Sequence, residues 1–227
     1  MISQVPQGQP SARLGQVERQ LRRHLAEPWL HPIADHQRPV FEQLRAWLAR
    51  VPEGARIELD AGCGTGASTL ALALADPSAW VIGVDKSSDR LVRAPELPAN
   101  AMLLRGDMID LWRLIAAAQL RFDQTWLLYP NPWPKPGHLA RRWHAHPVFP
   151  SIVASARTIE LRTNWRIYAE EFAHALALVL ERPVAVEPLD ASLAPISPFE
   201  RKYRASGHAL WRVVGGTNDR HGQVLGP

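Results

Sequence analysis

The hydrophobic positions near the start of the chain repeat at the spacing of α-helices. In residues 13–26, a basic segment, apolar residues lie three and four positions apart, and the same spacing returns in residues 41–48 after a loop with three prolines. Residues 1–12 are polar and contain Pro and Gly, which favours a loosely held arm. We therefore expect an arm and two helices in residues 1–53, ahead of a main domain in residues 54–227.

At residue 56 the pattern changes to short apolar runs that alternate with helical segments. The apolar runs, which predict seven strands, are residues 56–61, 80–85, 101–107, 122–130, 158–163, 183–190 and 208–216. The helical segments between them are residues 64–75, 87–94, 108–120, 147–157 and 164–182. Regular alternation is typical of α/β proteins, so we expect a mostly parallel seven-stranded sheet with helices on both faces. Such sheets bind ligands at the carboxyl ends of their strands.

Composition narrows the class of protein further. Of the 227 residues, 46% are hydrophobic and 21% are charged, which excludes a wholly disordered chain. No apolar run approaches the ~20 residues of a membrane span, so we expect no membrane association. The single cysteine, Cys63, excludes an internal disulfide framework and a cysteine-rich zinc site. We expect a cytoplasmic protein, a monomer or homodimer, whose net charge of +4 slightly favours a polyanionic partner.

A glycine-rich turn follows the first strand expected in the main domain. Its sequence is Asp60-Ala-Gly62-Cys-Gly64-Thr-Gly66, and a helix is expected to begin within it. Glycine permits a tight turn and lets a ligand approach the backbone closely, while the free N–H groups at a helix start add donors. The spacing G-x-G-x-G differs from the G-x-G-x-x-G fingerprint of dinucleotide sites. A strand-to-helix turn without a ligand is the alternative interpretation.

Acidic residues end the next two expected strands. Asp85 ends the first of them, where a carboxylate can accept hydrogen bonds from both hydroxyls of a ribose. Asp107 ends the second and is placed to meet an adenine amine. Together with the glycine turn, these acids resemble the S-adenosylmethionine site of class I methyltransferases, whose loop reads (D/E)-x-G-x-G-x-G. The resemblance implies S-adenosylmethionine as cofactor, with Asp60 and the three glycines at its methionine part, Asp85 at the ribose and Asp107 at the adenine.

The fourth expected strand leads into a long loop with a specific pattern. The loop begins Tyr129-Pro-Asn131-Pro-Trp133-Pro-Lys135 and continues to Arg141-Arg142. It resembles the (F/Y)-P-D-P-W-x-K segment and the R-R pair of the tRNA (guanine-N7-)-methyltransferases. Two further landmarks of that family follow in order: T-D-W is met as Thr163-Asn164-Trp165, and T-x-F-E as Ser197-Pro198-Phe199-Glu200. The chain is therefore identified as a member of this family, with tRNA as its expected partner.

The resemblance implies a role for each of these residues. Asn131 stands beside the cofactor and the transferred methyl group, and together with Asn164 it makes up the catalytic pair. The residues that bind substrate are Trp133, Lys135, Asn164, Trp165, Ser197, Phe199 and Glu200. Arg141, Arg142 and the basic N-terminal helix meet phosphates. The transfer needs no metal.

Two positions depart from the family pattern, because Asn131 and Asn164 replace aspartates. Guanine N7 has a lone pair and no proton, so it needs no general base, but methylation leaves the ring cationic. A carboxylate can hold the N1–H and the exocyclic amine and stabilise that charge, whereas Asn carries no charge. Without the charge, recognition is expected to weaken by ~1.5–3 kcal/mol at each position unless another acid, Glu200 or Glu170, compensates.

Two alternatives to tRNA methylation stay open. Asn131-Pro132-Trp133 also resembles the (N/D)-P-P-(Y/F/W) motif of amino-methyltransferases, in which Asn orients a planar nitrogen and an aromatic ring stacks on the substrate. That resemblance implies an N-methyltransferase of a small purine-like heterocycle, with Trp133 as the stacking ring. The other alternative is a non-catalytic protein that binds S-adenosylmethionine or RNA, with the two Asn residues marking an inactive site.

Overall fold

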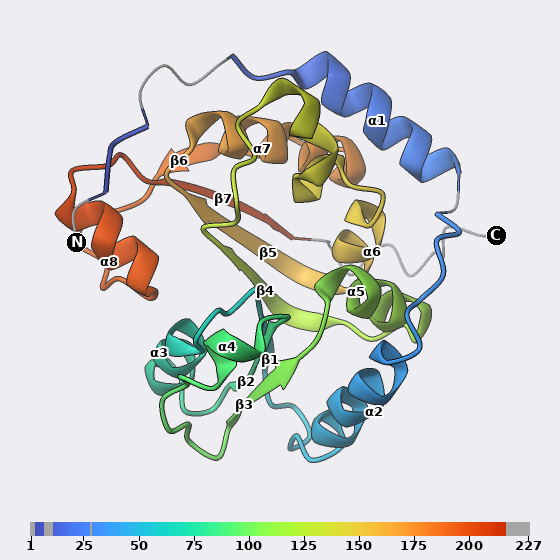
Figure 1. Cartoon of the computed structure of the whole chain (residues 1–227), viewed down its shortest axis with the longest axis vertical. Helices are drawn as coiled ribbons and strands as arrows, with labels where there is room; N and C mark the ends of the chain where they lie inside the picture. Colours follow the sequence, from blue (N-terminus) through green and yellow to red (C-terminus); the bar gives the residue numbers. More distant parts are fainter. Residues whose placement is uncertain (1–2, 7–10, 28, 217–227) are drawn as a thin grey trace.

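The computed structural model describes residues 3–6, 11–27 and 29–216, and it builds them around one seven-stranded sheet (Figure 1). The strands are β1 Ile57–Ala61, β2 Trp80–Asp85, β3 Ala101–Arg105, β4 Phe122–Leu128, β5 Ala156–Thr163, β6 Val186–Pro188 and β7 Trp211–Gly216. Their order across the sheet is β3-β2-β1-β4-β5-β7-β6. The first five strands run parallel, and β7 lies antiparallel between β5 and β6. The predicted α/β fold with a mostly parallel sheet is confirmed.

Helices cover both faces of this sheet. The α-helices are α1 Leu14–Ala26, α2 Gln37–Leu48, α3 Ala67–Ala75, α4 Ser88–Leu91, α5 Met108–Ala117, α6 Phe149–Ala154, α7 Arg166–Leu180 and α8 Pro198–Ala205. Alternate side chains of β2 show the two layers, since Ile82 and Val84 belong to the large core cluster and Val81 to a smaller one. The large cluster includes buried residues of α1, α2, α5, α6 and α7, whereas the smaller cluster includes residues of α3.

The first two helices are part of the main core. Val17 and Leu21 of α1, and Leu44 and Trp47 of α2, are buried in the same cluster as the sheet and α7. Their apolar faces follow the three-and-four spacing seen in the sequence. The division of the chain at residue 53 stays a prediction. Every helix in the described part of the chain falls short of the length and apolar character that crossing a membrane requires.

Two of the departures from the predicted elements are an earlier start of β5 and an additional helix. Ala156 already belongs to β5, although the pattern assigned it to the preceding helix. Helix α8 lies where the pattern predicted no element. Its start has S-x-x-E spacing with proline at the first helical position, and Ser197 is its N-cap: the Ser197 hydroxyl accepts a hydrogen bond from the N–H of Glu200 at 3.1 Å. This signal was present in the sequence, because Ser197 and Glu200 have the spacing that is typical of a helix start.

Candidate functional site

The glycine turn joins β1 to α3 with positive φ angles, which residues other than glycine rarely adopt. Gly62, Gly64 and Gly66 have φ angles of 80°, 63° and 77°. A Cβ atom added to Gly62 or Gly64 would meet nothing within 4 Å, so the backbone there faces open space. At Gly66 an added Cβ would lie 2.6 Å from Cδ1 of Leu103. The turn therefore needs glycine for its dihedral angles at all three positions, and at Gly66 also for space.

Asp60, the first residue of this turn, is buried, and only one of its two carboxylate oxygens has a hydrogen-bond partner among the described residues. Its Oδ2 accepts hydrogen bonds from the hydroxyls of Ser68 and Thr69, at 2.6 and 2.7 Å. Its Oδ1 has no partner among the described residues. Burial raises the pKa of Asp60 from 3.8 to about 6. A buried acceptor without a partner is rare in folded proteins and calls for an explanation, of which the donor of a bound ligand is one.

Asp85 connects the end of β2 to the glycine turn. Its carboxylate accepts hydrogen bonds from the N–H groups of Gly64 and Ser87, at 2.9 and 2.8 Å, and Arg90 lies 3.4 Å away. Asp107, just beyond β3, caps α5 by accepting the N–H of Ile109 at 2.9 Å. Since β1, β2 and β3 are adjacent and parallel, all three acids lie at one edge of the sheet.

The β4–α6 loop, residues 129–148, begins in a constrained conformation. Tyr129 and Trp133 have φ angles of 52° and 44°, which residues other than glycine rarely adopt. Asn131 is exposed, and its Oδ1 accepts the N–H of Trp133 at 3.2 Å. The Arg141 guanidinium lies over the Trp133 ring, 4.7 Å from its centroid, and His138 approaches the ring edge-on at 5.6 Å. A stacking face at Trp133 is thus shared with an arginine of the same loop.

Lys135 lies in the same loop, exposed, just before the 3-10 helix η1 (Pro136–Arg141). A second 3-10 helix, η2 (Trp143–Ala145), follows and packs against α1 and α7. On α1, Arg19 and Arg23 line a shallow depression of about 280 Å³ with two glutamines. Arg22 on the same helix is paired with Glu18 at 2.7 Å. The basic helix therefore lies beside this loop, and Arg19 and Arg23 line its surface depression.

Arg142 does not lie where a phosphate could reach it, which corrects the expectation drawn from the R-R pair. It is 3% exposed, and its guanidinium is paired with the buried carboxylate of Glu171 on α7. Its Nη2 also donates to the carbonyl oxygen of Trp133 at 3.0 Å. Glu171 further binds Nε2 of His144 at 3.1 Å and accepts the N–H of Arg13 at 3.0 Å. This Glu171 cluster (Arg13, Trp133, Arg142, His144, Glu171) joins the start of α1, the β4–α6 loop and α7.

Asn164 and Trp165 lie at the carboxyl end of β5. Asn164 is buried, and its Nδ2 donates to Nδ1 of His208 at 3.0 Å. Trp165 is half-buried and precedes α7, and its N–H donates to Oγ1 of Thr163 at 3.1 Å. The structure thus gives Asn164 a partner from the α8–β7 connection. Sequence reasoning had not singled out His208.

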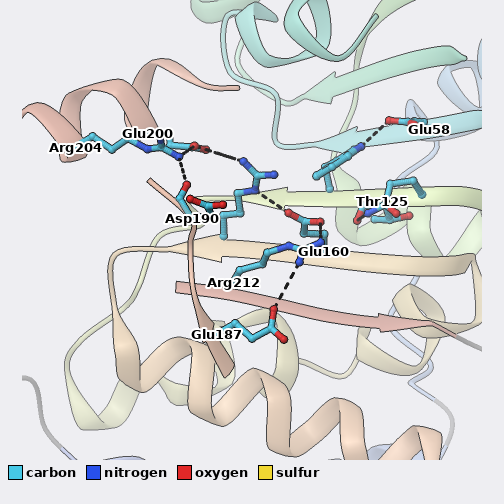
Figure 2. A network of polar contacts seen from close by, with 11 residues as sticks. Glu58, Thr125, Glu160, Glu187, Asp190, Glu200, Arg204 and Arg212 are labelled. Atoms are coloured by element: carbon cyan, nitrogen blue, oxygen red, sulfur yellow. Dashed lines mark hydrogen bonds and ion pairs between the residues drawn. The ribbon is translucent and has the colours of Figure 1, made fainter. Parts of the chain in front are cut away.

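Glu200 holds α8 against the sheet. Its carboxylate is fully buried and is bound by Arg162 of β5 at 3.1 Å and by Arg204 of α8 at 2.8 Å (Figure 2). Arg162 in turn pairs with Glu160 at 2.7 Å, and Glu160 pairs with Arg212 of β7 at 3.0 Å. In this arrangement Glu200 serves the fold, and its carboxylate is enclosed rather than open to a substrate, contrary to the expected role. The neighbouring Ser197 is buried as the cap of α8, while Phe199 is exposed.

The two acids named as replacements for the missing carboxylates are both already paired. Glu200 is balanced by two arginines, and Glu170 pairs with Arg166 at 2.8 Å on the surface of α7. Each of these two carboxylates thus already has an arginine partner. Asn131 and Asn164 carry neutral amides and therefore add no negative charge of their own.

Comparisons with known proteins match most of the chain. A family model described as "Putative methyltransferase" matches residues 55–213. The tRNA (guanine-N(7)-)-methyltransferase of Mycobacterium avium (strain 104) is 33% identical over 182 residues, which cover 74% of this chain and 68% of that protein. The tRNA (guanine-N(7)-)-methyltransferase of Burkholderia lata is 26% identical over 187 residues, which cover 78% of this chain and 72% of that protein.

A solved structure supports the same fold. The 16S rRNA methyltransferase KamB superposes with a TM-score of 0.55 at 17% sequence identity, covering 84% of this chain and 97% of that one. Likeness at this level of identity concerns the fold alone.

Proposed function

Because this chain belongs to the tRNA (guanine-N(7)-)-methyltransferase family, we propose that it methylates a ring nitrogen of a nucleobase in tRNA, with guanine N7 as the leading acceptor. The observation that carries the proposal is the cradle at the end of β1. There the glycine turn opens to space and Oδ1 of Asp60 is buried without a partner among the described residues. The loop that bears Asn131 follows β4, which is the direct neighbour of β1.

S-adenosylmethionine is the cofactor, and the residues present fit it. Gly62 and Gly64 leave their backbone open to a ligand, Asp60 offers a buried acceptor, and Asp85 adds a carboxylate at the adjacent strand end. When bound, S-adenosylmethionine would supply a methyl group carried on a cationic sulfur. The sulfur keeps the electron pair of the S–C bond, and the lone pair of the acceptor nitrogen forms the N–C bond. The chain's contribution to rate is chiefly to hold the two reactants in line.

On the acceptor side, the chain uses neutral groups. Guanine N7 gives up no proton on methylation, so no side chain has to act as a base. Asn131 and Asn164 can pair with the neutral amide edge of a base but do not offset the positive charge that methylation leaves on the ring. Arg19 and Arg23 of α1, beside the β4–α6 loop, provide positive charge for RNA phosphates.

A small free heterocycle is the second candidate acceptor. The observation that favours it is the absence of an unpaired carboxylate among the acids considered at the substrate end: Glu200 and Glu170 are both bound by arginine in the described structure. A cationic methylguanine product would gain little stabilisation there, whereas an acceptor whose ring N–H proton passes to solvent water ends neutral and needs no carboxylate. A cytoplasmic location and a monomeric or dimeric state remain part of the proposal.

The decisive experiment is methyl transfer from labelled S-adenosylmethionine. Unmodified tRNA and a panel of free purines are offered separately, and the RNA is digested to nucleosides afterwards. Label recovered as 7-methylguanosine supports the proposal, and label only in free purines supports the second candidate. Cofactor binding without transfer to any acceptor would contradict both and favour a binding protein. The Asn131→Asp variant is expected to increase the label in guanine, because it restores a negative charge beside the methylated ring.

A further inference from the structure

The described part of the N-terminal arm, residues 3–6, lies against the carboxyl end of β5 and the start of β7. A pocket of about 310 Å³ forms there, lined by Val5, Pro6, Asn164, Arg166, His208, Ala209 and Trp211. Thr163 and Trp211 are paired in the register of β5 and β7, which brings Trp211 close to the position of Asn164. Residues far apart in the sequence thus line one open pocket that includes Asn164, which was expected to belong to the catalytic pair.

Hydrogen bonds fix the arm in this position. The N–H of Ser3 donates to Oγ of Ser206 at 3.0 Å, and the carbonyl oxygen of Ser3 lies 3.3 Å from Nε2 of His208. The other ring nitrogen of His208 accepts the Nδ2–H of Asn164 at 3.0 Å. His208 therefore links the arm to Asn164 through contacts at both of its ring nitrogens.

The lining of the pocket is that of a site for a flat ring. Trp211 supplies an aromatic wall with the guanidinium of Arg166 5.0 Å from its ring centroid. Val5, Pro6 and Ala209 add apolar surface, and Asn164 and His208 add the polar atoms. A volume of about 310 Å³ is at the lower end of the range for small-molecule pockets, which suits one ring system better than a longer stretch of nucleotide chain.

We propose that residues 3–6 of the arm form one wall of the acceptor pocket, and that this pocket holds one planar nitrogen heterocycle against Trp211 and the Asn164–His208 pair. The inference rests on the proposed function, since it takes Asn164 as a residue of the acceptor side. It adds the arm, His208 and Trp211 to that site.

The test fills the pocket from the arm. In Val5→Trp a larger ring occupies the space beside Asn164, while the residues of the glycine turn stay unchanged. Leu30→Trp makes the same kind of addition at a side chain that is 85% exposed, and it is the matched control. Ser206→Ala removes the acceptor for the Ser3 N–H without adding bulk. For each protein, guanosine binding is measured by titration calorimetry in the presence of S-adenosylhomocysteine, and cofactor affinity is measured separately.

We expect Val5→Trp to weaken guanosine binding by about tenfold or more, Ser206→Ala to weaken it less, and neither to change cofactor affinity by more than about twofold. Equal guanosine affinity in Val5→Trp and Leu30→Trp would overturn the inference, and so would a wild-type protein that does not bind guanosine. Guanosine binding that disappears in Val5→Trp, in a protein whose wild type transfers no methyl group to any acceptor, would support the pocket and refute the proposed function instead.

Discussion

Replacing Glu171 should destabilise this protein strongly with almost no change in side-chain volume. In Glu171→Gln the carboxylate that pairs with Arg142, His144 and the N–H of Arg13 becomes a neutral amide. Burial lowers the pKa of His144, so Arg142 is the cation that loses its partner. Removing one member of a buried ion pair typically costs about 3–5 kcal/mol, because the other charge is left without compensation in a dry site.

The expected change is large enough for a thermal melt. In a protein of 150–250 residues, 1 kcal/mol corresponds to about 2–4 °C in Tm, so Glu171→Gln should lower Tm by about 6–20 °C. Circular dichroism measures this shift, and urea unfolding gives the free-energy difference independently.

Glu170→Gln is the matched control, because Glu170 is the preceding residue of α7 and its partner Arg166 is largely exposed. An exposed pair of this kind contributes about 0–1 kcal/mol. If the two variants unfold at the same temperature, the Glu171 cluster does not stabilise the β4–α6 loop as its burial suggests.

Three further variants test the cofactor end. Because burial raises the pKa of Asp60 from 3.8 to about 6, the folded protein holds this proton more tightly than the unfolded chain, and stability is lost as pH rises through that interval. The unfolding free energy of wild type minus that of Asp60→Asn should therefore fall by roughly 2–3 kcal/mol between pH 4 and pH 7, and a flat difference would contradict the shift. Asp85→Ala should weaken S-adenosylmethionine binding by about tenfold or more in calorimetry, because it removes the carboxylate that holds the turn at Gly64, and unchanged affinity would place the cofactor elsewhere. Gly66→Ala should destabilise the protein by about 1–3 kcal/mol in urea unfolding, since φ is 77° and Leu103 is in the way, whereas Gly137→Ala, in open space, should have little effect.

The sheet and the cofactor end were predictable because local signals carry them. Short apolar runs separated by helical segments predict parallel strands, and a glycine turn after a strand predicts a ligand cradle whatever the rest of the chain does. Helix α8 was predictable from a local signal as well, because a serine followed three residues later by a glutamate is typical of a helix start, and Ser197 and Glu200 have this spacing. Glu171 also left a trace, since it lies three and four positions from the buried Tyr168 and Ile167 on the same face of α7.

The remaining features depend on long-range interactions that no local pattern encodes. Two adjacent arginines predict a basic surface, yet Arg142 is buried, because a carboxylate 29 positions away pairs with it. The Asn164–His208 pair joins residues that are 44 positions apart, and nothing around His208 in the sequence indicates that it pairs with Asn164. The arm was expected to be loosely held, and its polar composition gave no sign that Ser3 bonds to the α8–β7 connection.

The position of β7 sets the order in which this molecule can be completed during synthesis. β7 is the last strand of the sheet to be made, yet it lies between β5 and β6. Ser3 precedes its partner Ser206 by 203 positions, so Ser3 is synthesised long before Ser206. A nascent chain that has reached α5 already carries the cofactor cradle, while the wall of the heterocycle pocket must wait for the final strand. Pairings of such long range form slowly, so the capacity to bind the cofactor should arise before the capacity to use it.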